Sequence, residues 1–188
     1  MIYFTADLHF GHANVIKHCG RPFASAAEMD AALTRNWNET VNKNDEVYIL
    51  GDFTMKPAET AHDYLTALKG RKYFIRGNHD RFLDRIDAFG NHFEWVRDYY
   101  VLNYGGRVFV LFHYPIAEWH GFFRGSLHLY GHVHNSTVST ARIDDSVLAF
   151  NVGVDCNGFR PVSDRDIIAM ADARLKVTPR LKSRNDIE

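Results

Sequence analysis

The sequence has only two cysteines, Cys19 and Cys156, and no excess of basic residues. Two thiols without a CxxC pair exclude a disulfide-rich scaffold and are typical of a reduced, cytosolic protein. The net charge of -1 and the isoelectric point near 6.8 argue against a broad basic surface for nucleic acid. We therefore expect no stable nucleic-acid partner.

Long hydrophobic runs are also missing, since no segment approaches the roughly 20 apolar residues that cross a bilayer. The first residues form a short apolar run without a basic leader or a cleavage site, so we expect a cytoplasmic protein with no membrane attachment. The sequence shows no repeat, low-complexity tract or linker. A chain of 188 residues with 46% hydrophobic residues suits one domain over residues 1–188, with a frayed polar tail over 181–188.

Six short apolar runs each end in polar or turn-forming residues. The runs cover residues 2–6, 47–50, 73–75, 108–112, 127–130 and 147–150. Their content of Val, Ile, Tyr and Phe predicts strands that are buried on both faces. Because ligands of open α/β sheets bind beyond the carboxyl ends of the strands, we expect these polar residues to meet at one site.

Helix signals lie between the predicted strands. Ser25 and Glu28 form an S-x-x-E capping box before an apolar stripe with a spacing of four residues. Pro57 suits the first position of a second helix, which Gly70 closes. A third helix is expected over residues 80–89, and Gly105-Gly106 predicts a hairpin turn. The coarse picture is an α/β domain with a mixed sheet between helical layers.

Two pairs of residues that can bind metal alternate along the chain. Asp7 and His9 follow the first predicted strand, and His132 and His134 follow the fifth. Residues two apart on a strand point to the same side, so each pair can converge on one point. Either pair alone is weak evidence, because such residues are often only surface groups.

Three further strand ends complete the set of candidate ligands. Gly51 lets the chain turn so that the Asp52 carboxylate can approach a cation, and its two oxygens can bridge two ions. Asn78 offers an amide oxygen, and His79 directly after it suggests a second role beside ligation. His113 adds another imidazole at a strand end.

These oxygen and nitrogen donors predict a site for two divalent ions. Without thiolate ligands the set favours Mn, with Fe, Zn, Co or Ni also suitable, over Ca or Mg. Seven ligands exceed what one tetrahedral site takes, so two ions that share Asp52 are the economical interpretation. Two ions about 3.5–4 Å apart can clamp a phosphate and activate a water that bridges them for in-line attack.

Taken together, the motifs resemble those of the calcineurin-like metallophosphoesterases. The family pattern D-x-H, G-D, G-N-H-[DE], H and G-H-x-H is present in order between Asp7 and His134. The resemblance implies a four-layer α/β/β/α fold, in which two mixed sheets pack as a sandwich flanked by helices. It also implies the following ligands: Asp7, His9 and His134 for one metal, Asn78, His113 and His132 for the other, with Asp52 as the bridge.

The same resemblance implies a catalytic role for His79, which would protonate the leaving oxygen. The protein-phosphatase branch continues its second motif as G-D-x-x-D-R-G, whereas this chain continues from Asp52 as FTMKP. The Asp that orients the catalytic histidine in that branch therefore has no counterpart. A phosphoprotein substrate is not expected, and the group that orients His79 is left open.

Four residues are candidates for substrate contacts. The segments 10–14 and 21–23 resemble a small bacterial and phage-type subgroup, which would place His12, Asn14 and Arg21 near the phosphate. The planar fork of an arginine matches phosphate oxygens. Arg76, before the Gly-Asn-His run, can contact phosphate or pair with an acidic neighbour, and each of the four can also be an ordinary loop residue.

The leading hypothesis is a phosphodiesterase or phosphatase that acts on a small, nucleotide-like phosphate ester through a hydroxide that bridges the two ions. A metal-dependent nuclease is the second hypothesis, although the near-neutral charge counts against it. A binding scaffold that has kept the fold but lost turnover is the third. Such a scaffold is expected to have lost ligands, and this sequence has lost none. The oligomeric state is not indicated.

Overall fold

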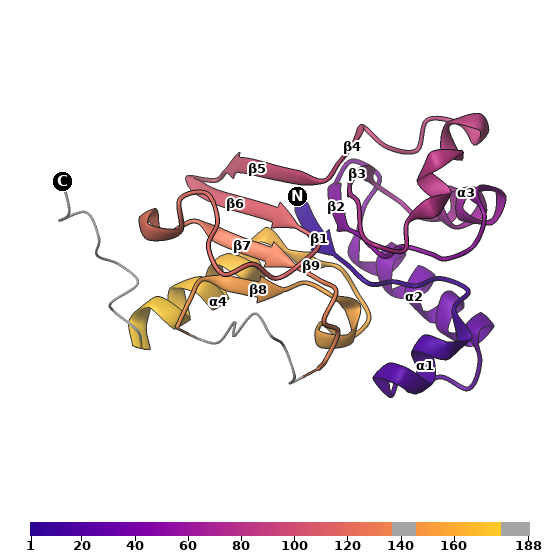
Figure 1. The fold of residues 1–188 in the computed structure, drawn as a ribbon, viewed down its shortest axis with the longest axis horizontal. Helices are drawn as coiled ribbons and strands as arrows, with labels where there is room; N and C mark the ends of the chain where they lie inside the picture. The colour runs from indigo at the N-terminus through magenta and orange to yellow at the C-terminus, as the bar shows by residue number, and fades with distance from the viewer. Residues whose placement is uncertain (137–145, 178–188) are drawn as a thin grey trace.

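A computed structural model describes residues 1–136 and 146–177, which form two β-sheets with helices around them (Figure 1). The first sheet has the strand order β4-β3-β2-β1-β9. Its strands are β1 (Ile2–Thr5), β2 (Glu46–Leu50), β3 (Arg71–Ile75), β4 (Trp95–Arg97) and β9 (Val162–Ser163). Strands β1 to β4 are parallel, and β9 runs antiparallel to β1.

The second sheet has the order β5-β6-β7-β8. Its strands are β5 (Tyr99–Tyr104), β6 (Arg107–Phe112), β7 (Leu127–Tyr130) and β8 (Ala149–Asn151). The antiparallel pair β5 and β6 is joined at Gly105-Gly106, as the sequence predicts, and β6, β7 and β8 are parallel. All six strands predicted from the apolar runs are present.

Four α-helices connect or follow these strands: α1 (Ala13–Cys19), α2 (Ala26–Thr40), α3 (Ala58–Ala67) and α4 (Asp164–Val177). The predicted capping box is confirmed, because Ser25 accepts a hydrogen bond from the Glu28 N–H. Pro57 is the residue before α3 rather than its first residue. The sequence patterns did not predict α1 or α4.

The helix expected over residues 80–89 is instead a pair of short 3₁₀ turns, Arg81–Asp84 and Ile86–Phe89. Arg85 between them has φ -134° and ψ 0°, which interrupts any continuous helix. The Asp80 side chain before the first turn accepts hydrogen bonds from a different loop instead of capping the helix. Two further 3₁₀ turns cover Phe122–Arg124 and Val154–Cys156.

Two hydrophobic layers hold the first sheet between them. One face packs against α2 and α3, with Trp37 and Leu65 fully buried against Phe74 of β3. The other face packs against the second sheet, where the rings of Phe4 and Phe109 lie 5.4 Å apart. Burying one such side chain contributes about 1.5–3 kcal/mol.

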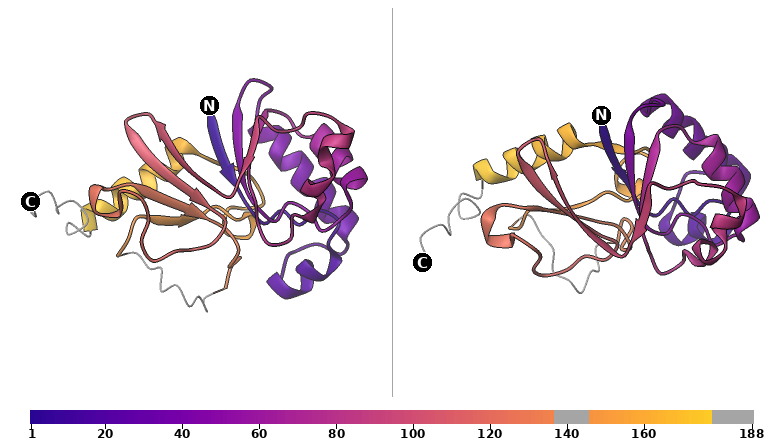
Figure 2. Two further views of the ribbon diagram at one scale, coloured as in Figure 1. Left: turned by 45° about the horizontal axis from the view of Figure 1, so that its top comes forward. Right: turned by 90° about the horizontal axis from the view of Figure 1, so that it is seen from above.

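Helix α4 adds to the layer between the sheets and lies on the other side of the first sheet from α1, α2 and α3 (Figure 2). The predicted fold class, two mixed sheets packed together and flanked by helices, is confirmed. The predicted frayed tail, 181–188, lies outside the described residues.

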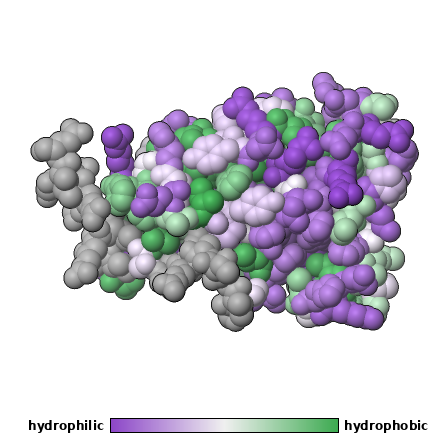
Figure 3. Space-filling model, viewed as in Figure 1, coloured by the Kyte–Doolittle hydropathy of each residue, from purple (hydrophilic) through white to green (hydrophobic). Residues whose placement is uncertain are grey.

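The surface in Figure 3 is mostly hydrophilic, with hydrophobic side chains in scattered patches. Among the described residues, no helix is long and apolar enough to cross a membrane.

Candidate metal centre

The loops that follow strands of both sheets bring the predicted ligands to one place. Asp7 and His9 follow β1, and Asp52 follows β2. The remaining four follow β3, β6 and β7: Asn78, His113, His132 and His134. Each ligand lies just beyond the carboxyl end of its strand, where α/β sheets bind their ligands.

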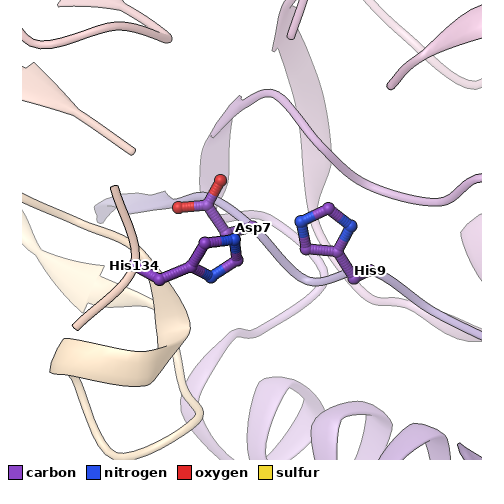
Figure 4. A group of neighbouring side chains, drawn as sticks. All are labelled: Asp7, His9 and His134. Carbon is purple, nitrogen blue, oxygen red and sulfur yellow. The ribbon is translucent and has the colours of Figure 1, made fainter. Parts of the chain in front are cut away.

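Asp7, His9 and His134 form the first cluster, here called the inner group (Figure 4). One ligand atom of each lies within 4.8 Å of the others. Asp7 and His9 are buried, His134 is half-buried, and the rings of His9 and His134 are 5.2 Å apart. The Asp7 carboxylate also accepts hydrogen bonds from the His132 N–H at 3.0 and 2.9 Å.

Asp52, His113 and His132 form the second cluster, here called the outer group. Asn78 joins it, because its Oδ1 lies 3.0 Å from both His113 Nε2 and His132 Nδ1. Asp52 and His113 are buried, whereas His132 is exposed. The outer group therefore opens toward solvent and the inner group lies beneath it.

Asp52 faces both groups at once. Its Oδ2 lies 3.6 Å from Nε2 of His9, and its Oδ1 lies 3.6 Å from Nε2 of His113. One oxygen is thus directed to the inner group and the other to the outer group. This is the arrangement that a carboxylate shared by two ions requires.

The ligand-bearing backbone is strained. Five of the six described non-glycine residues with positive φ are predicted ligands: Asp7 (57°), His9 (53°), Asp52 (54°), His132 (71°) and His134 (50°). Residues other than glycine rarely adopt this region, and such strain clusters at functional sites where the surrounding structure enforces it. The strain turns both residues of each alternating pair toward the centre.

Glycines leave room for the two carboxylates. A Cβ added at Gly131 would lie 2.8 Å from Asp7 Oδ2, and one at Gly153 would lie 2.7 Å from the same atom. A Cβ at Gly77 would collide with Asp52 Oδ1 and lie 2.7 Å from the Asp52 nitrogen. Any larger residue at these positions would push a carboxylate away from the centre.

The polar atoms of the centre fit a pair of cations. Nδ1 of His113 lies 2.7 Å from the Leu50 carbonyl oxygen and must donate to it, which leaves a lone pair on Nε2. That lone pair faces the Asn78 and Asp52 oxygens, which are also acceptors. Both ring nitrogens of His9 are buried without a hydrogen-bond partner. Acceptors that face one another without a proton between them are suited to a shared cation.

Burial keeps these imidazoles in the form that binds metal. It lowers the pKa of His9 to about 2 and also lowers the pKa of His113, so both are neutral at pH 7. Burial raises the pKa of the Asp7 carboxyl to about 7. A cation next to Asp7 would offset the cost of burying its charge.

His79 lies on the open side of the centre. Its side chain is 41% exposed, and its Nε2 lies 4.0 Å from Asp52 Oδ2. The His79 backbone N–H donates to Asp52 Oδ1 at 3.0 Å, and its ring lies 5.7 Å from that of His9. The position suits contact with a substrate, and its catalytic role stays a prediction.

The predicted substrate contacts fall in different places. The His12 ring lies 5.6 Å from that of His9, and its Nδ1 is buried without a partner. Asn14 is exposed on the first turn of α1. Arg76 is 41% exposed and pairs with Asp84 at 3.3 Å, which matches its alternative as a partner of an acidic residue.

Arg21 differs from the expected contact with phosphate. Its side chain is fully buried, and its guanidinium binds Asp155 together with the carbonyl oxygens of Asp7 and Leu8. Those partners lie in the interior of the protein, so the guanidinium is directed to the interior and not toward a substrate. An isolated arginine in a loop gives no sign of such burial, because arginine is usually exposed.

Two acidic residues near the centre were not predicted. Asp80 accepts hydrogen bonds from the backbone N–H groups of Asp52, Phe53 and Gly77, and burial raises its pKa to about 7. The sequence signal for Asp80 was its position at the end of the Gly-Asn-His-Asp run. Asp155 contacts His134, and its only signal was its position four residues after the end of β8.

Comparisons with known proteins agree with this geometry. A family model described as the calcineurin-like phosphoesterase superfamily domain matches residues 1–170. The uncharacterized protein MJ1445 of Methanocaldococcus jannaschii is 38% identical over 165 residues, or 86% of each chain. The gene 66 protein of Mycobacterium phage D29 is 42% identical over 83 residues, which cover 43% of this chain and 40% of that protein.

One solved structure is similar over nearly the whole chain. It is that of AQ665, a protein of unknown function from Aquifex aeolicus, with a TM-score of 0.73 and 27% sequence identity. The match covers 90% of this chain and 98% of that one. The arrangement of both sheets is therefore shared beyond the motifs themselves.

Proposed function

The chain belongs to the calcineurin-like phosphoesterase superfamily, and from this we propose that it hydrolyses a small phosphate ester with two divalent ions bound. The inner group would hold one ion, and the outer group with Asn78 would hold the other. Asp52 would contact both ions through its two oxygens. Mn is the proposed metal, because the ligands are nitrogen and oxygen donors without thiolate.

The convergence of lone pairs in the outer group carries the proposal. Nε2 of His113 and Nδ1 of His132 each face the same Asn78 oxygen at 3.0 Å. The neutral His113 ring has one proton, on Nδ1, and donates it in a hydrogen bond to the Leu50 carbonyl oxygen. Its Nε2 therefore has no proton to donate to the Asn78 oxygen. Two acceptors held 3.0 Å apart, His113 Nε2 and Asn78 Oδ1, are unfavourable without a cation between them, which supports metal binding over a scaffold without metal.

When bound, the two ions supply positive charge for the phosphate oxygens and lower the pKa of a water molecule. The chain's own residues complete the chemistry. His79, on the open side and 41% exposed, would deliver a proton from Nε2 to the leaving oxygen. Asp52 holds the His79 loop through the backbone N–H of His79, so the acid and the shared ligand keep a fixed relation.

A nucleotide-like monoester or diester is the proposed substrate class. The net charge of -1 gives no general attraction for a polyanion, which favours a small substrate over a nucleic-acid strand. His12 is proposed as a phosphate contact, because its ring lies 5.6 Å from that of His9. We also propose a cytoplasmic location, which fits the use of only two cysteines.

The test is turnover of bis-p-nitrophenyl phosphate and p-nitrophenyl phosphate by the full chain with added Mn. We expect hydrolysis of at least one ester. His79→Ala should lower kcat by about 10²–10⁴-fold on a phosphate ester of a simple alcohol, whose alkoxide leaves poorly without a proton. It should have a smaller effect on the nitrophenyl esters and should not change the metal content. His120→Ala is the matched control, because His120 is exposed and lies outside both groups.

The outcomes separate the competing functions. Cleavage of labelled single-stranded DNA or RNA, but of neither small ester, would favour the nuclease. A protein that binds no metal and cleaves neither ester would be a scaffold. If His79→Ala cleaves the ester of a simple alcohol as fast as the wild type does, the proposed acid is wrong while the metal-dependent function stands.

A further inference from the structure

A buried ion pair lies directly beneath the inner group. Nε of Arg21 donates to Asp155 Oδ1 and Nη2 donates to Asp155 Oδ2, both at 2.8 Å. The two side chains are 0% and 1% exposed. A planar guanidinium that meets both oxygens of a carboxylate fixes the orientation of each partner.

Asp155 in turn fixes His134. Nδ1 of His134 lies 2.7 Å from Asp155 Oδ2, and an ionised carboxylate only accepts hydrogen bonds. When the His134 ring is neutral, its proton is therefore on Nδ1, and Nε2 keeps its lone pair for a cation. A carboxylate behind a histidine ligand sets the tautomer and the direction of the ring.

Arg21 also fixes the other side of the inner group. Its Nη2 donates to the Asp7 carbonyl oxygen at 2.7 Å, and its Nη1 donates to the Leu8 carbonyl oxygen at 3.0 Å. Those two carbonyls belong to the strained segment between Asp7 and His9. One guanidinium thus ties the Asp7–Leu8 backbone, which leads into His9, to the Asp155 side chain behind His134. Arg21 and Asp155 are 134 residues apart in sequence.

Cys19 lies close enough to His134 and Asp155 to suggest an additional metal position there. The neighbouring groups argue against it, because Arg21 already neutralises Asp155 and its charge would repel a cation. Burial raises the pKa of the Cys19 thiol to about 11, so at pH 7 the sulfur is protonated and a poor ligand. The cluster is therefore a support for the inner group.

We propose that Arg21 and Asp155 act as a positioning pair that sets the affinity of the inner group for its cation. The outer group has separate supports, the Leu50 carbonyl oxygen behind His113 and Asp80 behind the Asp52 backbone. The effect should therefore be confined to one of the two ions. This inference rests on the proposed function only in assuming that the inner group binds metal.

The experiment is titration of the metal-free full chain with Mn, followed by calorimetry and metal analysis, for wild type, Asp155→Asn and Arg21→Lys. We expect one ion to bind about 10–100-fold more weakly in Asp155→Asn, and the other to keep its affinity. Arg21→Lys keeps the charge but loses the fork, so its effect should be smaller and at the same ion. At saturating metal, KM for the ester should match the wild type.

A second readout needs neither metal nor substrate. At a pH high enough to keep His134 neutral, long-range ¹⁵N–¹H NMR of the metal-free chain should show its proton on Nδ1 in the wild type. Asp155→Asn should show a mixture of tautomers. Arg107→Lys and Asp172→Asn are the controls, because that ion pair is partly exposed and neither residue belongs to the inner or the outer group. They should change neither the titration nor the spectrum.

The outcomes distinguish this inference from the proposed function. If Asp155→Asn and Arg21→Lys bind both ions as the wild type does, with an unchanged His134 spectrum, the positioning role is overturned. If Asp155→Asn does not fold, as judged by circular dichroism, Arg21→Lys decides the question by the same two readouts. A wild type that binds no metal would overturn both the inference and the binuclear proposal, whereas a wild type that binds two ions without turnover would leave the inference supported.

Discussion

The inner and outer groups offer similar donors but are built differently. The inner group is buried and tied by Arg21 and Asp155, while the outer group is open on one side because His132 is exposed. In the outer group the imidazoles of His113 and His132 instead approach a shared Asn78 oxygen. Ligands that are held in place before a cation arrives bind it with less loss of freedom. We therefore expect the inner group to fill first and to release its ion last.

The largest expected effects come from removing one histidine from each group. His134→Ala should abolish binding at the inner group, and His132→Ala should leave one tightly bound ion there. Both should lower kcat/KM by more than the roughly 10–100-fold typical of residues behind the ligands. Metal analysis after gel filtration checks this. If His134→Ala keeps a tightly bound ion and His132→Ala does not, the outer group is the tighter site.

Glycine substitutions should separate the groups without removing a ligand. Gly153→Ala would crowd Asp7 Oδ2, at 2.7 Å, and Gly77→Ala would crowd Asp52. Each should destabilise the protein by about 1–3 kcal/mol, as overpacking does. Gly153→Ala should mainly weaken the tight ion, whereas Gly77→Ala should weaken both because Asp52 faces both groups.

Thermal melting with and without Mn measures these effects, because a ligand that binds only the folded state raises the melting temperature. Gly125→Ala is the control, since no atom lies within 4 Å of the added Cβ. Because φ at Gly125 is 78°, alanine there adds backbone strain but no steric overlap. Equal stabilisation by Mn in all three variants would show that the glycines matter only for folding.

A smaller change is expected when charge is added to the outer group. Asn78→Asp replaces an amide oxygen by a carboxylate at the position that faces His113 and His132. The weaker ion should bind severalfold more tightly, which narrows the difference between the groups. Mn titration by calorimetry checks this, with Asn78→Ala as the opposing variant. Tightening of the stronger ion instead would place Asn78 with the inner group.

The smallest effect is expected for Arg76→Ala. Arg76 is 41% exposed and pairs with Asp84 and Asp98, so the loss should be no more than about 1 kcal/mol of stability. Metal affinity and kcat/KM should stay within about twofold, which corresponds to less than 1 kcal/mol. Steady-state kinetics decides, and a selective rise in KM would show that Arg76 contacts the substrate.

The sequence predicts the convergence of the candidate ligands well because they follow strands that are easy to recognise. Asp7, Asp52 and His113 each end an apolar run, and parallel strands deliver their carboxyl ends to one edge. His132 and His134 lie beyond the end of β7 with positive φ, so the backbone conformation there, and not strand alternation, directs both side chains to the centre. Local sequence patterns therefore predict the positions of the candidate ligands and of the six strands.

The supports of the centre depend on contacts that no local pattern encodes. Arg21 and Asp155 are 134 residues apart, and the subgroup motif that includes Arg21 gives no sign of this partner. The pair of 3₁₀ turns after Asp80 was also missed, because the Asp80 side chain is used by another loop. Helix propensity and motif matching describe neighbours in sequence, and tertiary contacts override both.

The centre lies on a seam, since one sheet supplies Asp7, His9, Asp52 and Asn78 and the other supplies the remaining three histidines. Under the proposed function, metal binding would depend on how the two sheets are packed, and so on contacts such as Phe4–Phe109 that include no candidate ligand. A shift of one sheet against the other would move the two sets of candidate ligands apart.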